Sequence, residues 1–109
     1  MKLVKLENMK GGWFIGNFEP NCHRTSEFEV ACKSYEPGVG EVLHVHKIGT
    51  EVTLIAIGKA RMNGVAVGSG DIVILEPGQA TDFMALEKTI TVVVKFPSVT
   101  GDKYTLTRD

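Results

Sequence analysis

The sequence is poor in the features that mark several large classes of protein. It has only two cysteines, Cys22 and Cys32, with no CxxC spacing, so neither a disulfide scaffold nor a zinc ribbon is expected. We predict two reduced thiols, with a bridge between them as the alternative. The chain carries 12 basic and 13 acidic residues, and it therefore lacks the positive charge that nucleic acids or acidic membranes attract.

Long apolar runs are also missing. No stretch approaches the roughly 20 apolar residues of a membrane span, and the N-terminal "MKLVKLENMKGGW" lacks the apolar core and cleavage site of a signal peptide. We therefore expect a cytoplasmic protein that binds neither membranes nor nucleic acid. A chain of 109 residues can bury one hydrophobic core but hardly two, which predicts a single domain over residues 1–109.

No window keeps the apolar spacing of an amphipathic helix, whereas short β-branched runs recur between Gly, Pro, Asn and Asp. The chain is therefore predicted to be all-β. The expected strands are 3–6, 12–18, 27–35, 41–46, 51–62, 65–67, 70–75, 81–86, 89–96 and 104–106. Asn63-Gly64 predicts a tight type I′ hairpin, and a second hairpin is expected around Glu87-Lys88. Even strand spacing indicates a sandwich, a barrel or a jelly roll without choosing among them.

The stretch "HVHKIGTE" is the strongest candidate for chemistry. His44 and His46 share one face of a strand because side chains alternate across it, and Glu51 opens the returning strand. Two nitrogens and one carboxylate form the ligand set of iron(II) oxygenases, and they also suit manganese, nickel, zinc or copper. The alternative is a pair of ordinary polar residues beside a charge at a hairpin end.

The wider spacing resembles the first motif of the cupin superfamily, G(X)5HXH(X)3-4E(X)6G. Its fixed positions are occupied by Gly38, His44, His46, Glu51 and Gly58. Residues 70–85 resemble the second motif, G(X)5PXG(X)2H(X)3N, with Gly70 and Gly78 in place. The resemblance covers about residues 28–96 and is to a small single-domain cupin of the cupin 2 type. It implies a cupin-type jelly-roll β-barrel in which the motifs at 38–58 and 70–85 face each other across the interior.

The second motif departs from the pattern where it matters most. Thr81 stands where most cupins have a histidine as the fourth metal ligand, Glu76 replaces the first proline and Ala85 the asparagine. Three outcomes follow. A divalent transition metal is held by His44, His46 and Glu51 with waters; or Asp82 completes the site through a β-bulge; or the site is metal-free and the histidines bind an anion or a sugar.

Further residues are predicted to line a substrate pocket: Thr53, Thr81, Phe83 and Lys33. Regular alternation after Glu51 also places Ile55 and Ile57 on the cavity floor, and Lys33 is a candidate for binding a carboxylate or a phosphate. The alternatives are plain barrel core for the apolar residues and solvated charge for the lysine. Lys95, inside a β-branched run, either faces water or projects into the cavity.

The function these observations favour is a small metal-binding cupin of unknown substrate, either a metal-dependent dioxygenase or an isomerase-type enzyme. The alternatives are a metal-free sugar or nucleotide-sugar isomerase-like protein, with His44 or His46 as base, and a non-catalytic dimeric accessory domain; whether the chain is an enzyme stays open. The expected partners are a small molecule and a second copy. The homodimer is suggested by aromatic residues at 13–18 and by Val52, Leu54 and Ala56 on an outer strand face.

Overall fold

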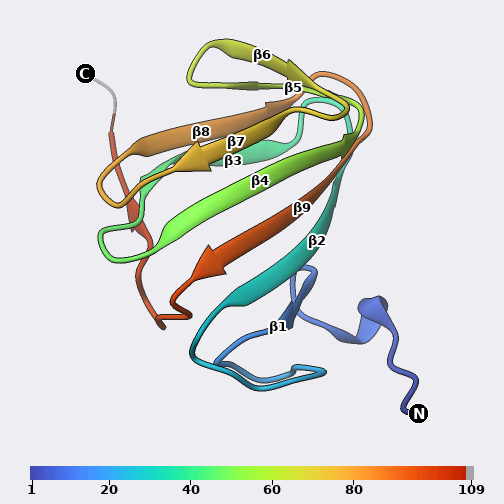
Figure 1. The fold of residues 1–109 in the computed structure, drawn as a ribbon. Coiled ribbons are helices and arrows are strands. Elements are labelled where there is room, and N and C mark those ends of the chain that lie inside the picture. The colour runs from blue at the N-terminus through green and yellow to red at the C-terminus, as the bar shows by residue number, and fades with distance from the viewer. Residues whose placement is uncertain (108–109) are drawn as a thin grey trace.

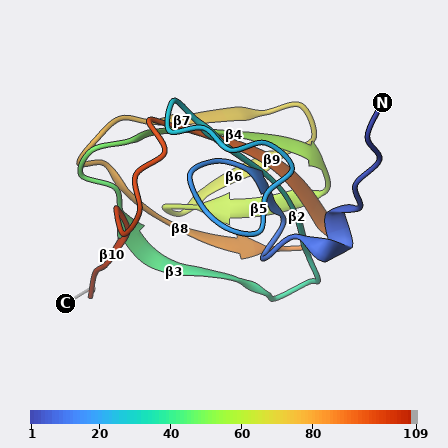
Figure 2. The ribbon, with the colours of Figure 1, turned by 90° about the horizontal axis from the view of Figure 1, so that it is seen from below.

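The computed structural model describes residues 1–107, which form two five-stranded antiparallel sheets that face each other (Figure 1). Sheet A contains, in spatial order, β1 (Trp13–Ile15), β2 (Glu29–Tyr35), β9 (Thr89–Phe96), β4 (Thr50–Ile57) and β7 (Ile72–Leu75). Sheet B contains β10 (Tyr104–Thr105), β3 (Gly40–Val45), β8 (Ala80–Ala85), β5 (Lys59–Met62) and β6 (Val65–Gly68). The predicted all-β jelly roll is therefore confirmed, and Figure 2 shows the two layers from below.

Residues 3–6 do not form the strand that their β-branched pattern predicted. The only helical element of residues 1–107 is a single 3-10 turn, Leu6–Asn8, and Leu3 is 83% exposed. A strand needs a neighbour to satisfy its backbone groups, and this segment makes no strand pairing. No helix in the described part of the chain has the length and apolar character needed to cross a membrane.

Two connections between strands distinguish the observed topology from the predicted one. The run 51–62 breaks at Gly58, where a φ of +104° ends β4 and lets β5 begin in the other sheet. The hairpin expected around Glu87-Lys88 is wrong, because β8 pairs with β3 and β5 whereas β9 pairs with β2 and β4. The predicted Asn63-Gly64 turn is present, with φ values of 51° and 75°.

The apolar core lies near the junction of β4 and β5. It consists of Tyr35, Ile55, Ala60, Met62, Phe83 and Ala85. The rest of the interior is lined largely by polar and charged side chains, including the candidate site. Cys22 and Cys32 are free thiols, as predicted.

Candidate metal centre

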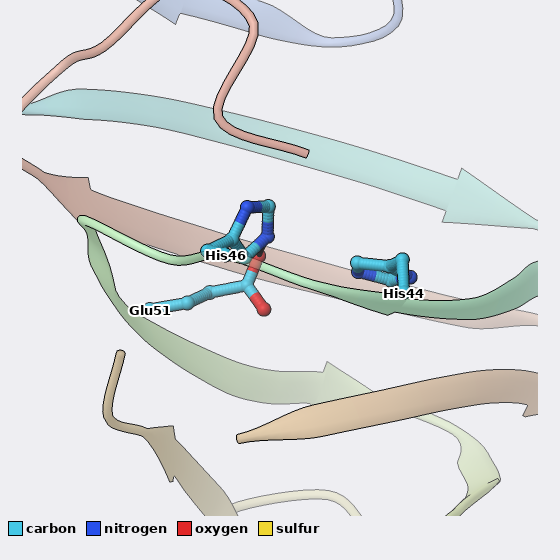
Figure 3. A group of neighbouring side chains, drawn as sticks. All are labelled: His44, His46 and Glu51. Atoms are coloured by element: carbon cyan, nitrogen blue, oxygen red, sulfur yellow. Dashed lines mark ion pairs between the residues drawn. The ribbon is translucent and has the colours of Figure 1, made fainter. Parts of the chain in front are cut away.

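Three side chains from the connection between β3 and β4 converge inside the barrel. His44 lies in β3, His46 follows it directly, and Glu51 is the second residue of β4. Their possible ligand atoms all lie within 4.8 Å of one another, and Figure 3 shows the Glu51 carboxylate directed toward His46. Both histidines are 6% exposed and the Glu51 side chain 12%. The structure thus gathers the three residues that the spacing singled out.

Backbone carbonyls orient both imidazole rings. His44 donates from Nδ1 to the Val42 carbonyl at 2.7 Å, and His46 donates from Nδ1 to the Asp102 carbonyl. A carbonyl can only accept, so the proton of each neutral ring lies on Nδ1 and the Nε2 lone pair is free. Fixing the tautomer through Nδ1 is the usual support of a metal-ligating histidine.

The free Nε2 of His46 is the clearest sign that something belongs in this site. It is buried, it has no hydrogen-bond partner among the described residues, and it lies 3.7 Å from Oε1 of Glu51. Burial alone would raise the pKa of Glu51, but His46, His44 and Lys95 hold it below its usual value. A lone pair and a carboxylate that face each other need a cation between them, either a second proton on the ring or a metal. The donor set therefore fits a divalent transition metal.

Asp102 supports the turn between the ligands, a role that no sequence pattern had predicted. Its carboxylate accepts hydrogen bonds from the backbone N–H groups of Lys47, Ile48 and Gly49 at 2.8–3.1 Å. Burial would raise the pKa of Asp102, but these three donors keep it below its ordinary value. Because its carbonyl also accepts from His46, one residue fixes both the turn and a ligand. It lies more than 50 positions further along the chain, just before the strand expected at 104–106.

The position of the usual fourth ligand offers no metal-binding atom. Thr81 pairs with His44 across β3 and β8, and its hydroxyl donates to the Asp82 carbonyl at 2.7 Å. The Asp82 carboxylate accepts from the backbone N–H of Asn63 at 2.8 Å and does not line the interior cavity. Of the three expected outcomes, completion of the site by Asp82 is therefore not supported.

A cavity of about 260 Å³ opens beside the three residues. The four residues predicted for the substrate pocket all line it: Lys33, Thr53, Thr81 and Phe83. Lys95, whose direction was open, also lines it and is 8% exposed. Ile57 is wrong as a floor residue, because a register shift after Ile55 turns it outward and leaves it 57% exposed. Ile55 itself is fully buried in the apolar core.

One carboxylate in the cavity is strongly stabilised as an anion. Glu41 lies 3.7 Å from Lys33 and 3.1 Å from Lys103, and it accepts a hydrogen bond of 2.7 Å from the Tyr35 hydroxyl. Burial opposes ionisation, but these three partners lower the pKa of Glu41 to about 2. Burial and the neighbouring carboxylate raise the pKa of Tyr35, so its phenol stays protonated.

A second carboxylate is shifted in the opposite direction. Glu29 is 7% exposed, and it pairs with Lys95 at 3.5 Å. Burial raises its pKa, and this effect outweighs the opposing attraction of Lys95. Neither glutamate was predicted as a site residue, although Glu29 alternates in step with Ala31 and Lys33 and so belongs on the inner face of its strand.

Comparison with known proteins supports the fold. No family model matches the sequence, and no curated protein is significantly similar to it. A conserved protein of Klebsiella pneumoniae with a double-stranded β-helix domain, itself uncharacterized, is 28% identical, with a TM-score of 0.70 over 77% of this chain and 74% of that one. KdgF from Halomonas is 17% identical, with a TM-score of 0.61 over 67% and 72%.

Oxalate decarboxylase from Bacillus subtilis, described with Mn(II) centres, is 22% identical, with a TM-score of 0.64 over 75% of this chain but only 25% of that one. The chain thus has the cupin, or double-stranded β-helix, fold. It carries a buried His44, His46 and Glu51 cluster that forms a candidate metal site.

Proposed function

We propose that this protein is a metal-dependent cupin enzyme whose His44, His46 and Glu51 hold one divalent transition ion: iron, manganese, nickel, zinc or copper. The observation that carries the proposal is the buried, unpartnered Nε2 of His46 beside the Glu51 carboxylate. Such an ion, when bound, supplies Lewis-acid polarisation of a substrate oxygen. Because the protein offers three ligands, positions remain for the substrate.

Of the two expected enzyme classes, the isomerase type has the better support from the surrounding residues. General acid–base catalysis favours a group whose pKa lies near the working pH. Where the surroundings lower the pKa of one carboxyl group and raise that of another, the first stays ionised and the second can carry the proton. Glu41 is too acidic to accept a proton, whereas Glu29 is shifted upward. Glu29 is therefore the candidate to hold and release a proton, while the Tyr35 phenol stays a hydrogen-bond donor.

Metal titration of purified, chelator-stripped protein tests the proposal. With Mn²⁺ as the probe, we expect one ion per chain and a higher melting temperature, since a ligand of the native state stabilises it. His44→Ala and His46→Ala should each weaken binding by about 100-fold or more, because loss of a supporting residue alone typically costs 10- to 100-fold.

His23→Ala is the matched control, because His23 is the one other histidine and is exposed. This variant should bind like the original protein. Failure to bind Mn²⁺, Zn²⁺ or Fe²⁺, or equal binding by all three histidine variants, would contradict the proposal.

The two alternatives, a metal-free nucleotide-sugar isomerase-like protein and a non-catalytic accessory domain, gain no specific support. A cavity of about 260 Å³ lies below the roughly 300–1,000 Å³ that drug-sized ligands occupy, so a nucleotide-sugar fits it poorly. A purely structural accessory domain gives no reason for placing six buried or half-buried ionisable side chains around one cavity. They are Glu29, Lys33, Glu41, Glu51, Lys95 and Asp102.

A further inference from the structure

The inner face of sheet A arranges its side chains in three rows. Strand pairing aligns Trp13, Ala31, Val93 and Thr53 in the middle row. One flanking row contains Glu29, Lys95 and Glu51, and the other contains Lys33, Thr91 and Ile55. Apart from Trp13, the side chains of the middle row are small, and they leave room between the longer side chains of the two flanking rows. This arrangement produces the floor of the cavity.

Two lysines from opposite flanking rows converge on the Trp13 ring. The Lys33 ammonium lies 5.2 Å and that of Lys95 5.6 Å from the ring centroid. Their glutamate partners are 3.7 Å and 3.5 Å away, longer than the roughly 2.7–2.9 Å of a charge-assisted hydrogen bond. The two side chains are 18% and 10% exposed. Two shielded positive charges therefore lack close hydrogen bonds to these carboxylates.

An unpaired hydroxyl lies beside them. Thr91 pairs with Lys33 across β2 and β9, is 1% exposed and lines the cavity. Its Oγ1 is one of two buried side-chain atoms without a hydrogen-bond partner among the described residues, the other being His46 Nε2. A buried unsatisfied polar atom in a native protein calls for an explanation, and both of these residues line the same cavity.

We infer that the cavity binds a small carboxylate-bearing molecule, with the carboxylate held by Lys33, Lys95 and Thr91 beside Trp13. This inference rests on the proposed function, because the other end of the ligand faces the metal centre. A volume of about 260 Å³ favours a small ligand, such as a dicarboxylate or hydroxycarboxylate of a few carbons. Glu29 and Glu41 flank the lysines, and at this end of the ligand they favour a carboxylate group with a single negative charge over a phosphate with two.

Trp13 provides the readout because it is the sole tryptophan. Its fluorescence is titrated with succinate and, separately, with inorganic phosphate, using stripped and Zn²⁺-loaded protein. We expect saturable binding of succinate that is tighter with Zn²⁺, and at least 10-fold weaker binding of phosphate. Lys33→Met and Thr91→Val should each weaken succinate binding by 10-fold or more and leave the affinity for Zn²⁺ within about threefold.

Lys59→Met, which removes an exposed lysine of β5, is the control and should change neither affinity. If Zn²⁺ binds but succinate does not, or if Lys33→Met and Thr91→Val bind succinate normally, the carboxylate site is refuted while the metal centre stands. Equal affinity for phosphate also overturns it. If the unaltered protein does not bind Zn²⁺, the proposed function is contradicted instead.

A second, independent observation concerns the outer face of sheet A. Strand pairing forms two continuous rows across β2, β9, β4 and β7. They are Val30, Val94, Val52 and Ile74, and Cys32, Val92, Leu54 and Ile72. None is charged, and Ile72 and Ile74 are 61% and 59% exposed. The sheet is thus apolar outside and polar inside, the reverse of the usual pattern.

We propose that a second copy of this chain covers this face. The four strands have seven, eight, eight and four residues. At about 3.3 Å per residue and about 4.8 Å between strands they give roughly 430 Å² per copy, so a face-to-face pair buries about 850 Å², the size of a weak interface. A partner must be equally free of charge, and the same face of a second copy meets that condition. An isologous pair is also the commonest form of homo-oligomer.

Sedimentation equilibrium decides this proposal. The protein should have twice its chain mass of 11.9 kDa, and the double variant Ile72→Lys, Ile74→Lys should be monomeric. Val65→Lys is the control, because Val65 is also 61% exposed but lies in sheet B, and it should remain dimeric. A monomeric unaltered protein, or a double variant that still dimerises, contradicts the proposal.

Discussion

At the scale of single residues, Asp102 shows how a distant side chain can govern a site. The carboxylate satisfies three backbone donors of residues 47–49, and the carbonyl fixes the ring of His46. The metal candidates were predictable because His44, His46 and Glu51 stand at fixed spacing within one short stretch of sequence, from the end of β3 to the start of β4. Asp102 was not, because no local pattern shows which turn a tail residue will reach.

Replacing Asp102 should therefore weaken the site without touching a ligand. In Asp102→Ala, three backbone N–H groups lose their acceptor, that of Gly49 buried and those of Lys47 and Ile48 partly buried. This loss should cost about 1–3 kcal/mol of unfolding free energy. The affinity for Mn²⁺ should fall by about 10- to 100-fold, and Asp102→Asn should restore part of it. Asp71→Ala serves as the control, because Asp71 accepts from Gly68 in a separate, exposed turn.

Nitrogen NMR of His46 separates positioning from general damage. In the unaltered, metal-free protein we expect the Nδ1–H tautomer, and in Asp102→Ala a mixture of tautomers. An unchanged tautomer together with unchanged metal affinity would show that Asp102 supports only the turn.

At the scale of strands and turns, residue alternation predicted which side chains share a face of a strand better than it predicted which strands pair with each other. Seven of the expected runs contain strands near their predicted bounds, and the inner face of β8 follows from periodicity. In β3 a register shift between Glu41 and His44 breaks the alternation, so that both residues line the cavity. Which sheet a strand joins is not encoded in its own pattern, and so β8 and β9 were wrongly paired. A β-bulge also leaves no mark in the alternation pattern, and for this reason Ile57 was wrongly predicted to face the cavity.

Gly58 makes the crossing between sheets possible, and its replacement should be costly. An added Cβ at this position would lie 2.4 Å from the Lys88 carbonyl oxygen, in addition to the strain of a φ of +104°. Gly70 has a similar φ of +91° but open space around it. We expect Gly70→Ala to cost about 1–2 kcal/mol from strain alone and Gly58→Ala about 3 kcal/mol or more. Urea unfolding measures both, and equal costs would show that the close approach is unimportant.

At the scale of the whole molecule, the chain folds with charge inside and apolar surface outside one of its sheets. The motif spacing predicted the double-stranded β-helix, because the glycines and ligands of such a barrel recur at fixed positions. The inversion of sheet A was not predicted, since alternation defines two faces but not which one is enclosed. Lys95 is an example: it lies in a run of β-branched residues, and the structure places its side chain in the interior, 8% exposed.

The central claim is that His44, His46 and Glu51 bind one metal ion without a fourth protein ligand. Anomalous diffraction from crystals grown with Mn²⁺ tests it most directly. We predict a single strong peak within about 2.0–2.3 Å of one His44 nitrogen, Nε2 of His46 and a Glu51 oxygen, with the remaining positions filled by water or a small anion. A site without a peak at saturating Mn²⁺, or a peak that Thr81 or Asp82 coordinates, would contradict the claim.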